Sequence, residues 1–354
     1  AASDVYKRQE KRSGGYMKEA LLYKKLSENK VRCDLCNHHC VIREGERGKC
    51  GVRENRKGTL YTLVYGKAIA NHIDPIEKKP FFHFLPGSLS YSIATVGCNF
   101  TCLHCQNAEI SQYPKEHDGE IVGFDLSPEQ IVKEAKDNGC KSISYTYTEP
   151  TIFFEYALDT MKLAKEEGMK NIFITNGFMS KEAIDMMQPY LDAANIDLKS
   201  YSEKFYHTVC GGRLKPVLEN IEYMKKKGIW VEVTTLVIPG MNDDPMQIIS
   251  IAQFIKDIDP GIPWHISRFY PAYKLQEVLP TPAKTLINIR QMGLQVGLRY
   301  VYLGNVPGEG DGENTYCYNC HKLLIKRTGF SVFENHIKDG KCPFCGAKID
   351  IVEK

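Results

Sequence analysis

The chain has 354 residues, of which 43% are hydrophobic and 25% are charged, and its formal net charge is +3. This ordinary globular composition excludes a wholly disordered chain, a collagen-like repeat and a simple coiled coil. The small net charge gives no argument for nucleic-acid binding, and no uninterrupted apolar run reaches the roughly 18 residues of a membrane helix. We therefore expect a globular protein that binds neither nucleic acid nor membrane.

The first 16 residues, AASDVYKRQEKRSGGY, are polar and lack periodicity. We expect residues 1–16 to be a disordered or artefactual extension, with the true start at Met17. No apolar signal segment lies near the start, so export and a disulfide framework are not expected. We expect a cytoplasmic protein in which the grouped members of its 13 cysteines hold metal or perform redox chemistry.

Residues 17–89 are predicted to be a metal-binding region because they contain four closely spaced cysteines. These are Cys33, Cys36, Cys40 and Cys50. Four thiols suffice either for a zinc ion or for an auxiliary iron–sulfur cluster, and the spacing does not decide between them. Free thiols are the third alternative. His38 and His39 could replace a thiol, but a surface position is the better expectation for both.

Residues 90–303 alternate between apolar, β-branched stretches and amphipathic ones. Strands are expected at 90–96, 142–147, 171–175, 193–198, 230–238, 263–268 and 299–303. Helices are expected at 128–138, 151–167, 180–188, 215–227, 245–256 and near 282–292, the first of them with Ser127 as N-cap. Six strands that are each followed by a helix predict an α/β protein with a parallel sheet, either an open doubly wound sheet or a barrel.

In both architectures the loops at the carboxyl ends of the strands build the active site. Polar side chains stand at or near these points, at residues 98–105, Glu149, Asn176, Asp197, Lys199 and His265.

Cys98, Cys102 and Cys105 lie directly after the first strand of this region. Such a loop can bind three irons of a [4Fe–4S] cluster and leave the fourth iron open to a substrate. The alternatives are buried thiols or a zinc site that takes His104 as a fourth ligand. Because neighbouring ligands at His104 and Cys105 would strain a tetrahedron, we favour the cluster.

Residues 304–354 are predicted to form a C-terminal module that resembles a zinc ribbon or rubredoxin. The ligands are two C-x2-C knuckles, Cys317 with Cys320 and Cys342 with Cys345. Zinc is favoured and mononuclear iron is the alternative. About 40 residues bury little core, so a metal should stabilise the module. We expect residues 304–314 to be a mobile, solvated linker. The two remaining thiols, Cys140 and Cys210, are expected to pack in the core.

The segment CNFTCLHC at 98–105 resembles the C-x3-C-x2-C signature of the radical S-adenosylmethionine (radical SAM) superfamily. Further segments are similar to motifs of this superfamily and its glycyl-radical activating enzymes, namely YTEP at 147–150, TNG at 175–177, DLK at 197–199 and VIPGMND at 237–243. One departure is that Tyr147 and Thr148 replace the glycines of the commoner GGE motif. The resemblance implies a partial (β/α)6 TIM-like barrel, a [4Fe–4S] cluster on Cys98, Cys102 and Cys105, and SAM. It implies SAM contacts from His104, Gln106, Glu149, Asn176, Asp197, Lys199 and His265.

From Met17 to the C-terminus, stretches such as CDLCNHHC and HISRFYPAYKL resemble the radical SAM enzyme of the AmmeMemoRadiSam system. The implied partners are a reductant such as flavodoxin or ferredoxin, a protein substrate, and Memo-like or Amme-like proteins. The implied reaction is reductive cleavage of SAM to a 5′-deoxyadenosyl radical that abstracts hydrogen from an unidentified substrate, with activation of a glycyl-radical enzyme as one version. The alternative is a non-catalytic zinc-ribbon binding protein on a barrel scaffold.

Overall fold

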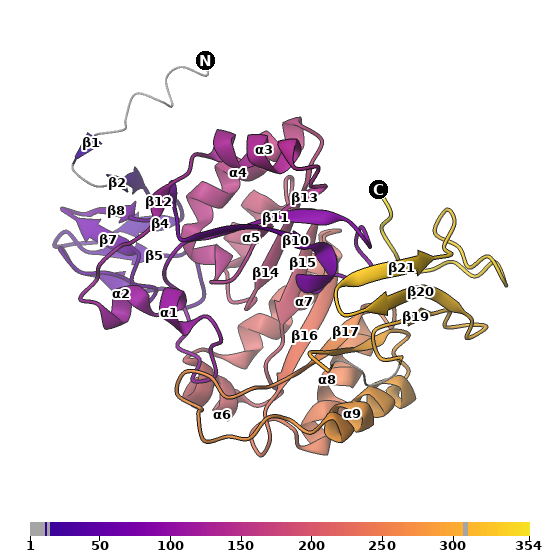
Figure 1. The fold of residues 1–354 in the computed structure, drawn as a ribbon. Helices are drawn as coiled ribbons and strands as arrows, with labels where there is room; N and C mark the ends of the chain where they lie inside the picture. The colour runs from indigo at the N-terminus through magenta and orange to yellow at the C-terminus, as the bar shows by residue number, and fades with distance from the viewer. Residues whose placement is uncertain (1–10, 13–14, 307–310) are drawn as a thin grey trace. The chain divides into compact units, whose positions relative to one another are not determined.

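The computed structural model describes residues 11–12, 15–306 and 311–354 (Figure 1). The chain divides into two compact units, each assembled from several stretches. Unit 1 comprises residues 1–73, 91–101 and 107–192, and unit 2 comprises residues 74–90, 102–106 and 193–354. The expected three-domain division by sequence segments stays a prediction, since each unit here is discontinuous.

Unit 1 begins with short antiparallel strands that the sequence did not reveal. They are β1 (Lys11–Arg12), β2 (Gly15–Tyr16), β3 (Lys18–Glu19), β4 (Tyr23–Lys25), β5 (Val31–Cys33), β6 (Val41–Ile42), β7 (Arg53–Arg56), β8 (Thr59–Thr62), β9 (Lys67–Ala68) and β12 (Phe124–Asp125). β1 pairs with β2, β9 pairs with β12, and the others form the three-stranded sheets β3-β8-β7 and β4-β5-β6. Strands this short carry too few residues for an alternating apolar pattern to show.

Unit 1 continues with strands and helices in alternation. The strands β10 (Ala70–Pro75), β11 (Leu89–Ala94), β13 (Ser142–Tyr145) and β14 (Lys170–Thr175) are neighbours in that order, and β13 and β14 are parallel. The helices are α1 (Ala108–Ser111), α2 (Tyr113–Glu116), α3 (Pro128–Asp137), the 3-10 turn η3 (Pro150–Phe153), α4 (Phe154–Glu166) and α5 (Lys181–Met187). α3 and α4 lie side by side (Figure 1). Ser127 forms the expected N-cap of α3, completed by Gln130 as a capping box.

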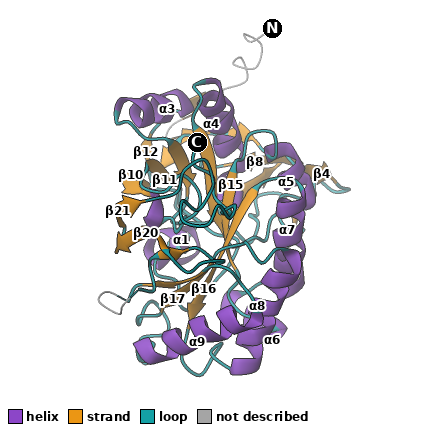
Figure 2. Cartoon of the chain, turned by 90° about the vertical axis from the view of Figure 1, so that its right-hand side faces the viewer, coloured by secondary structure: helices purple, strands orange, loops and turns teal. Residues whose placement is uncertain are grey.

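Unit 2 contains four parallel strands in the order β15-β16-β17-β18. They are β15 (Ala193–Asp197), β16 (Trp230–Val237), β17 (Trp264–Arg268) and β18 (Val301–Gly304). The helical elements of this unit are η2 (Ile76–Lys78), α6 (Glu203–Phe205), the π-helical turn η4 (Tyr206–Cys210), α7 (Leu214–Lys226), α8 (Pro245–Ile258) and α9 (Ala283–Val296). Figure 2 shows α8 and α9 beside each other. Helix α9 also packs against β17.

The C-terminal residues form the antiparallel sheet β19 (Thr315–Tyr316), β20 (Leu323–Thr328) and β21 (Ser331–Asn335). Its core is not separate, because Cys317 and Leu324 are buried in one cluster with Phe82 and Tyr300 of the same unit. A buried Arg327 adds polar contacts, since its guanidinium donates to the Phe82 carbonyl at 2.7 Å and to Thr315 Oγ1 at 2.7 Å. The C-terminal module therefore packs on the rest of unit 2 instead of standing alone.

The predicted alternation of strands and helices is confirmed from β11 to β18, with bounds that differ by a few residues at most. The α/β class is therefore confirmed, whereas closure into a partial barrel stays a prediction. Of the expected N-terminal extension, residues 1–10 and 13–14 lie outside the described residues, as do residues 307–310 of the expected linker. Among the described residues, no helix is both long and apolar enough to cross a membrane.

His83 is a fully buried histidine that connects the loop after η2 to the C-terminal end of the chain. Its Nδ1 lies 2.5 Å from the Asp350 carbonyl oxygen, and its Nε2 lies 2.5 Å from the Tyr302 hydroxyl. A carbonyl can only accept, so Nδ1 carries the proton and Nε2 accepts from Tyr302. Burial is the largest of the effects that lower the pKa of His83 to about 4.

We expect the metal-free protein to lose stability as the pH falls from about 6.5 to 4. The pKa of His83 is lower in the folded than in the unfolded state, so protonation favours unfolding in this window. The shift corresponds to about 3 kcal/mol of unfolding free energy. Urea unfolding at a series of pH values across this range measures the free energy of unfolding. This free energy should fall less steeply with decreasing pH in His83→Gln than in wild type. The exposed control His72→Gln should keep the wild-type slope; equal slopes in all three proteins would contradict the assignment.

Candidate active site

Cys98 follows β11 in unit 1, and its loop is fixed by backbone contacts. The Phe100 N–H donates to Cys98 Sγ at 3.3 Å, and Lys115 Nζ donates to the Cys98 carbonyl at 2.8 Å. Gly97 has φ +101°, and a Cβ there would come within 2.6 Å of Val52 Cγ1. Only glycine fits both this conformation and this close approach. An amide that donates to sulfur favours the thiolate form, which is the form that ligates iron.

Glu149 is buried at 3% exposure and accepts four hydrogen bonds within unit 1. Its Oε1 accepts from Thr151 N at 3.0 Å, Thr151 Oγ1 at 2.5 Å and Thr175 Oγ1 at 2.7 Å. Its Oε2 accepts from the Asn176 amide at 2.7 Å. Burial raises the pKa of Glu149, against the lowering effect of these donors. The carboxylate thus ties the ends of β13 and β14 together, and its contact with SAM stays a prediction.

We expect Glu149→Ala to lower the free energy of unfolding of the metal-free protein by about 3 kcal/mol, because four buried donors lose their acceptor. Urea unfolding without SAM isolates this structural effect from any role in binding. The exposed Glu166→Ala serves as a control and should leave stability within about 0.5 kcal/mol of wild type. A fully stable Glu149→Ala protein would show that the carboxylate is not a structural tie.

Asn176 and Tyr147 belong to the two loops that the Glu149 carboxylate connects. Asn176 is buried, and its Nδ2 donates to Asn99 Oδ1 at 2.7 Å. Tyr147 has φ +61°, a conformation that favours glycine. The motif therefore keeps the backbone shape of a glycine while carrying a side chain, whose ring lies 5.9 Å from that of His72. Asn107 stabilises this loop by donating from Nδ2 to the Tyr147 carbonyl at 2.9 Å.

In unit 2, Cys102 lies in a buried group with His104 and Cys210, whose ligand atoms are all within 4.8 Å of one another. The hydrogen bond with Cys210, together with burial, raises the pKa of Cys102 well above its ordinary value, while Lys199 acts in the opposite direction. Burial lowers the pKa of His104 to about 3, so its ring is neutral. Its Nδ1 is buried without a hydrogen-bond partner among the described residues.

The sequence did not establish that Cys210 lies near the CNFTCLHC motif. It is fully buried at the end of η4, as a packing thiol would be, but it packs beside Cys102. The backbone agrees with this placement, because the Leu103 amide donates to the Val209 carbonyl at 2.9 Å. No spacing in the sequence links a lone cysteine to a motif so far away along the chain. Because the ligand atoms of Cys102, His104 and Cys210 lie so close together, a single-ion site is an alternative to a cluster at Cys102.

The DLK segment places an ion pair next to Cys102. Lys199 Nζ lies 2.8 Å from Asp197 Oδ2. Burial disfavours the charge on Lys199, but Asp197 and then the thiols of Cys102 and Cys210 outweigh it and raise its pKa well above the ordinary value. An ammonium here can favour a thiolate at Cys102 or bind a carboxylate.

The VIPGMND segment holds the DLK backbone in place. Asn242 Nδ2 donates to the Lys199 carbonyl at 2.7 Å and to the Leu236 carbonyl at 2.8 Å. Its Oδ1 accepts from the Ile238 amide at 2.6 Å. The Lys199 amide in turn donates to the Tyr206 hydroxyl at 3.0 Å. Both motifs thus form one hydrogen-bonded arrangement at the carboxyl ends of β15 and β16.

His265 is paired along the strand ladder through Thr234 to Asp197, but its imidazole is already engaged. Its Nε2 lies 2.6 Å from Glu232 Oε2, and the residue is 3% exposed. Glu232 also accepts from the amides of Phe82 and His83 at 3.0 and 2.9 Å. These partners were not apparent from the sequence, and the expected contact of His265 with SAM stays a prediction.

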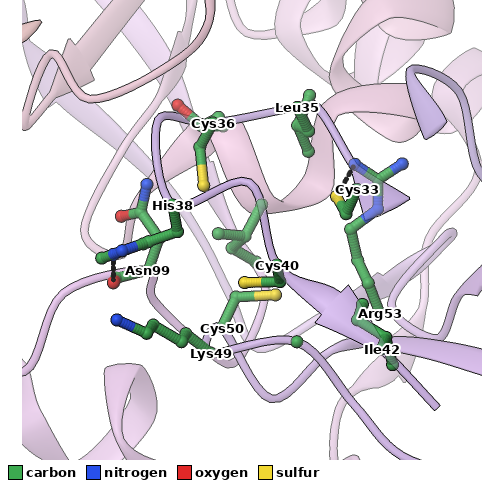
Figure 3. A pocket seen from close by; sticks show the side chains of 13 residues that line it. Cys33, Leu35, Cys36, His38, Cys40, Ile42, Lys49, Cys50, Arg53 and Asn99 are labelled. Carbon is green, nitrogen blue, oxygen red and sulfur yellow. Dashed lines mark hydrogen bonds between the residues drawn. The ribbon is translucent and has the colours of Figure 1, made fainter. Parts of the chain in front are cut away.

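The remaining expected site residues lie in three settings. Cys105 is half-buried and Gln106 is exposed. The C-terminal thiols come together, with 3.6 Å between the sulfurs of Cys317 and Cys345 and 3.7 Å between those of Cys320 and Cys342. A hydrogen bond from Asn319 lowers the pKa of Cys345 to about 6. The N-terminal four thiols line a pocket in unit 1, shown in Figure 3.

Comparison with known proteins gives the family. A model of the radical SAM superfamily matches residues 92–251. An uncharacterized protein of Methanocaldococcus jannaschii is 49% identical over 339 residues, which cover 95% of this chain and all of that protein. The pyruvate formate-lyase 1-activating enzyme of Escherichia coli K12 is 24% identical over 221 residues, or 58% of this chain and 89% of that enzyme.

Among solved structures, Streptococcus suis SuiB bound to S-adenosylmethionine matches with a TM-score of 0.49 and 16% identity, covering 65% of this chain and 53% of that one. The matched family region contains the CNFTCLHC loop and the YTEP, TNG, DLK and VIPGMND segments. The match to residues 92–251 shows that this chain is an enzyme with a radical SAM domain, and the three thiols and the ion pair beside Cys102 lie within that domain.

Proposed function

We propose that this enzyme cleaves SAM reductively and uses the resulting 5′-deoxyadenosyl radical to abstract hydrogen from a substrate. The observation that carries the proposal is the family match over a loop with three thiols, one of which lies beside the Lys199 ammonium. The resident group would be a [4Fe–4S] cluster on Cys98, Cys102 and Cys105. The donor chemistry fits, because thiolates suit iron, the Phe100 amide donates to Cys98 Sγ, and the Lys199 ammonium opposes the effects of Cys210 and burial that raise the pKa of Cys102.

When bound, the cluster and SAM supply the electron transfer and carbon–sulfur cleavage that generate the radical. The residues of the chain would hold and orient the cluster and SAM. Phe100 N–H and Lys115 fix the loop around Cys98. Lys199 and Asp197 offer one cation and one anion to the carboxylate and ammonium of SAM, in a backbone frame that Asn242 holds. Burial of His104 keeps its ring neutral, so it adds no competing charge beside Lys199.

The substrate class is proposed from the activating-enzyme motifs. TNG at 175–177 and DLK at 197–199 are similar to segments of glycyl-radical activating enzymes, and one relative is named pyruvate formate-lyase 1-activating enzyme. A backbone glycine of a partner protein is therefore the substrate we propose to test first, with Memo-like and Amme-like proteins as further candidate partners. The electron would come from a low-potential carrier such as flavodoxin or ferredoxin.

A second, structural metal is proposed at the C-terminal thiols. Four thiolates on one tetrahedral ion at a metal–sulfur distance of about 2.3 Å lie about 3.8 Å apart. The separations of 3.6 and 3.7 Å agree with this spacing. A single ion at Cys317, Cys320, Cys342 and Cys345 is therefore the proposal, with zinc favoured over iron.

The function is tested by anaerobic reconstitution with iron and sulfide, followed by reduction in the presence of SAM. The expected products are 5′-deoxyadenosine and methionine in equal amounts, formed only when the reductant is present. A colourless protein that binds zinc, leaves SAM intact and binds nucleic acid in a salt-dependent way would support the binding-protein alternative. SAM cleavage that yields other products would overturn hydrogen abstraction while keeping the family.

A further inference from the structure

The N-terminal cysteines line a pocket within unit 1. Cys33 ends β5, Cys36 and Cys40 lie on the loop to β6, and Cys50 precedes β7. All four line one pocket together with Arg53 and Asn99, among others. Figure 3 shows the sulfurs of Cys36, Cys40 and Cys50 around a common space, with Cys33 beside Arg53. Four thiols from one strand end and two loops thus line the same pocket, in a segment outside the radical SAM match at residues 92–251.

The sulfur spacing distinguishes this pocket from the C-terminal group. Among the described residues, only two groups have three or more ligand atoms all within 4.8 Å of one another, and none of the four N-terminal thiols belongs to either. Four thiolates on a single zinc would lie about 3.8 Å apart. Thiolates that bind different irons of one cluster lie further apart, because the cluster's own atoms separate them. No three of the N-terminal sulfurs therefore lie within 4.8 Å of one another, which is wider than a single zinc ion requires and leaves room for a group larger than one ion.

Buried hydrogen-bond donors line the same pocket. Arg53 is 1% exposed, and its Nη1 lies 3.7 Å from Cys33 Sγ. Its Nη2 contacts Glu155 at 2.5 Å, so the guanidinium stays charged, while its Nε has no hydrogen-bond partner among the described atoms. Asn99 Nδ2 is also buried without one. Unpaired buried donors cost free energy, and an anionic centre with several sulfur acceptors would satisfy them.

The pocket also adjoins the loop that starts the catalytic motif. His38 lines the pocket and donates from Nε2 to the Asn99 carbonyl at 2.8 Å. A Cβ on Gly97 would come within 2.9 Å of the Cys50 carbonyl oxygen. The backbone on either side of Cys98 is thus packed against the N-terminal thiol loops.

We propose that Cys33, Cys36, Cys40 and Cys50 ligate a second iron–sulfur cluster in which every iron is held by the protein. This site is distinct from the cluster at Cys98, Cys102 and Cys105 and does not depend on SAM cleavage. A cluster with complete protein ligation has no open iron and therefore does not bind SAM. Its position against residues 97–99 makes it a support for the catalytic loop.

The decisive experiment removes the catalytic thiols. The triple variant Cys98→Ala, Cys102→Ala, Cys105→Ala is reconstituted anaerobically, and iron and acid-labile sulfide are counted. Sulfide separates the alternatives because a single ion at the C-terminal thiols brings none. If the second cluster is [4Fe–4S], wild type should contain about eight sulfides per chain and the triple variant about four; a [2Fe–2S] cluster would give about six and about two. The spectrum of the reduced triple variant should not change when SAM is added.

Two further variants, made in the triple-variant background, check the ligands. Cys36→Ser should lose the remaining sulfide, whereas Cys140→Ala, which changes a buried thiol outside the pocket, should keep it. The proposal would be overturned if the triple variant contained no sulfide and its N-terminal thiols held either zinc or no metal. Should the triple variant not fold, wild type with only about four sulfides would overturn it equally. Intact sulfide in the triple variant together with wild type that leaves SAM uncleaved would refute the proposed function alone.

Discussion

Cys102→Ala is expected to reduce SAM cleavage by at least about 10³-fold, because the proposed [4Fe–4S] cluster would lose one of its three ligands. Cys102 is buried beside Lys199, so no neighbouring water can replace the thiolate without rearrangement. The measurement is 5′-deoxyadenosine formed per chain after anaerobic reconstitution and reduction.

The matched control is Cys140→Ala, which also removes a buried thiol but lies far from the motif in sequence and outside every thiol group named above. It should retain SAM cleavage within about twofold. Cys210→Ala adds a third comparison, since Cys210 lies within 4.8 Å of Cys102 without being part of the signature. Should Cys102→Ala cleave SAM normally while Cys210→Ala does not, the three-thiol assignment would be wrong.

Cys342→Ala is expected to destabilise the C-terminal module by about 4 kcal/mol or more, because the proposed metal would be lost. Cys342 is 1% exposed and belongs to the same buried cluster as Leu324 and Ile325. Its loss should therefore loosen the β19-β20-β21 sheet as well as the ion site. Thermal unfolding, metal content and limited proteolysis of residues 311–354 report this effect.

Phe344→Ala is the control, because Phe344 lies between Cys342 and Cys345 and is 57% exposed. It removes a large side chain from the same loop but leaves all four sulfurs in place, so stability should stay close to wild type. SAM cleavage by Cys342→Ala at a temperature where it remains folded should stay within a few-fold of wild type. Equal loss of cleavage at an unchanged melting temperature would place this metal in the reaction instead of in the fold.

Much of the α/β core could be predicted because its signals are local. Strand and helix positions from β11 to β18 follow from runs of apolar residues and from caps such as Ser127, which act within a few residues of each other. The short strands before β10 escaped prediction, since two to four residues show no period. Their order is set by pairing between distant segments, such as Lys18 with Thr62.

The candidate site shows the same division. The cysteine groups and the acid, amide and lysine after successive strands were visible in the sequence, because a spacing of ligands within one loop is a property of that loop. The sequence did not show that Glu149 accepts four hydrogen bonds, or that His265 pairs with Glu232. Both depend on which strands become neighbours and in which register, and each changes what the side chain is free to contact.

The sequence alone determined that this chain carries three thiols suited to an iron–sulfur cluster and two further groups of four thiols. It did so because consecutive residues fix the reach of each loop. Only the tertiary structure decided that, among the described residues, the C-terminal four sulfurs all lie within 4.8 Å of one another while no three of the N-terminal four do. The physical reason is that sulfur–sulfur distances between separate loops are set by the packing of the elements beneath them, and no local pattern records that packing.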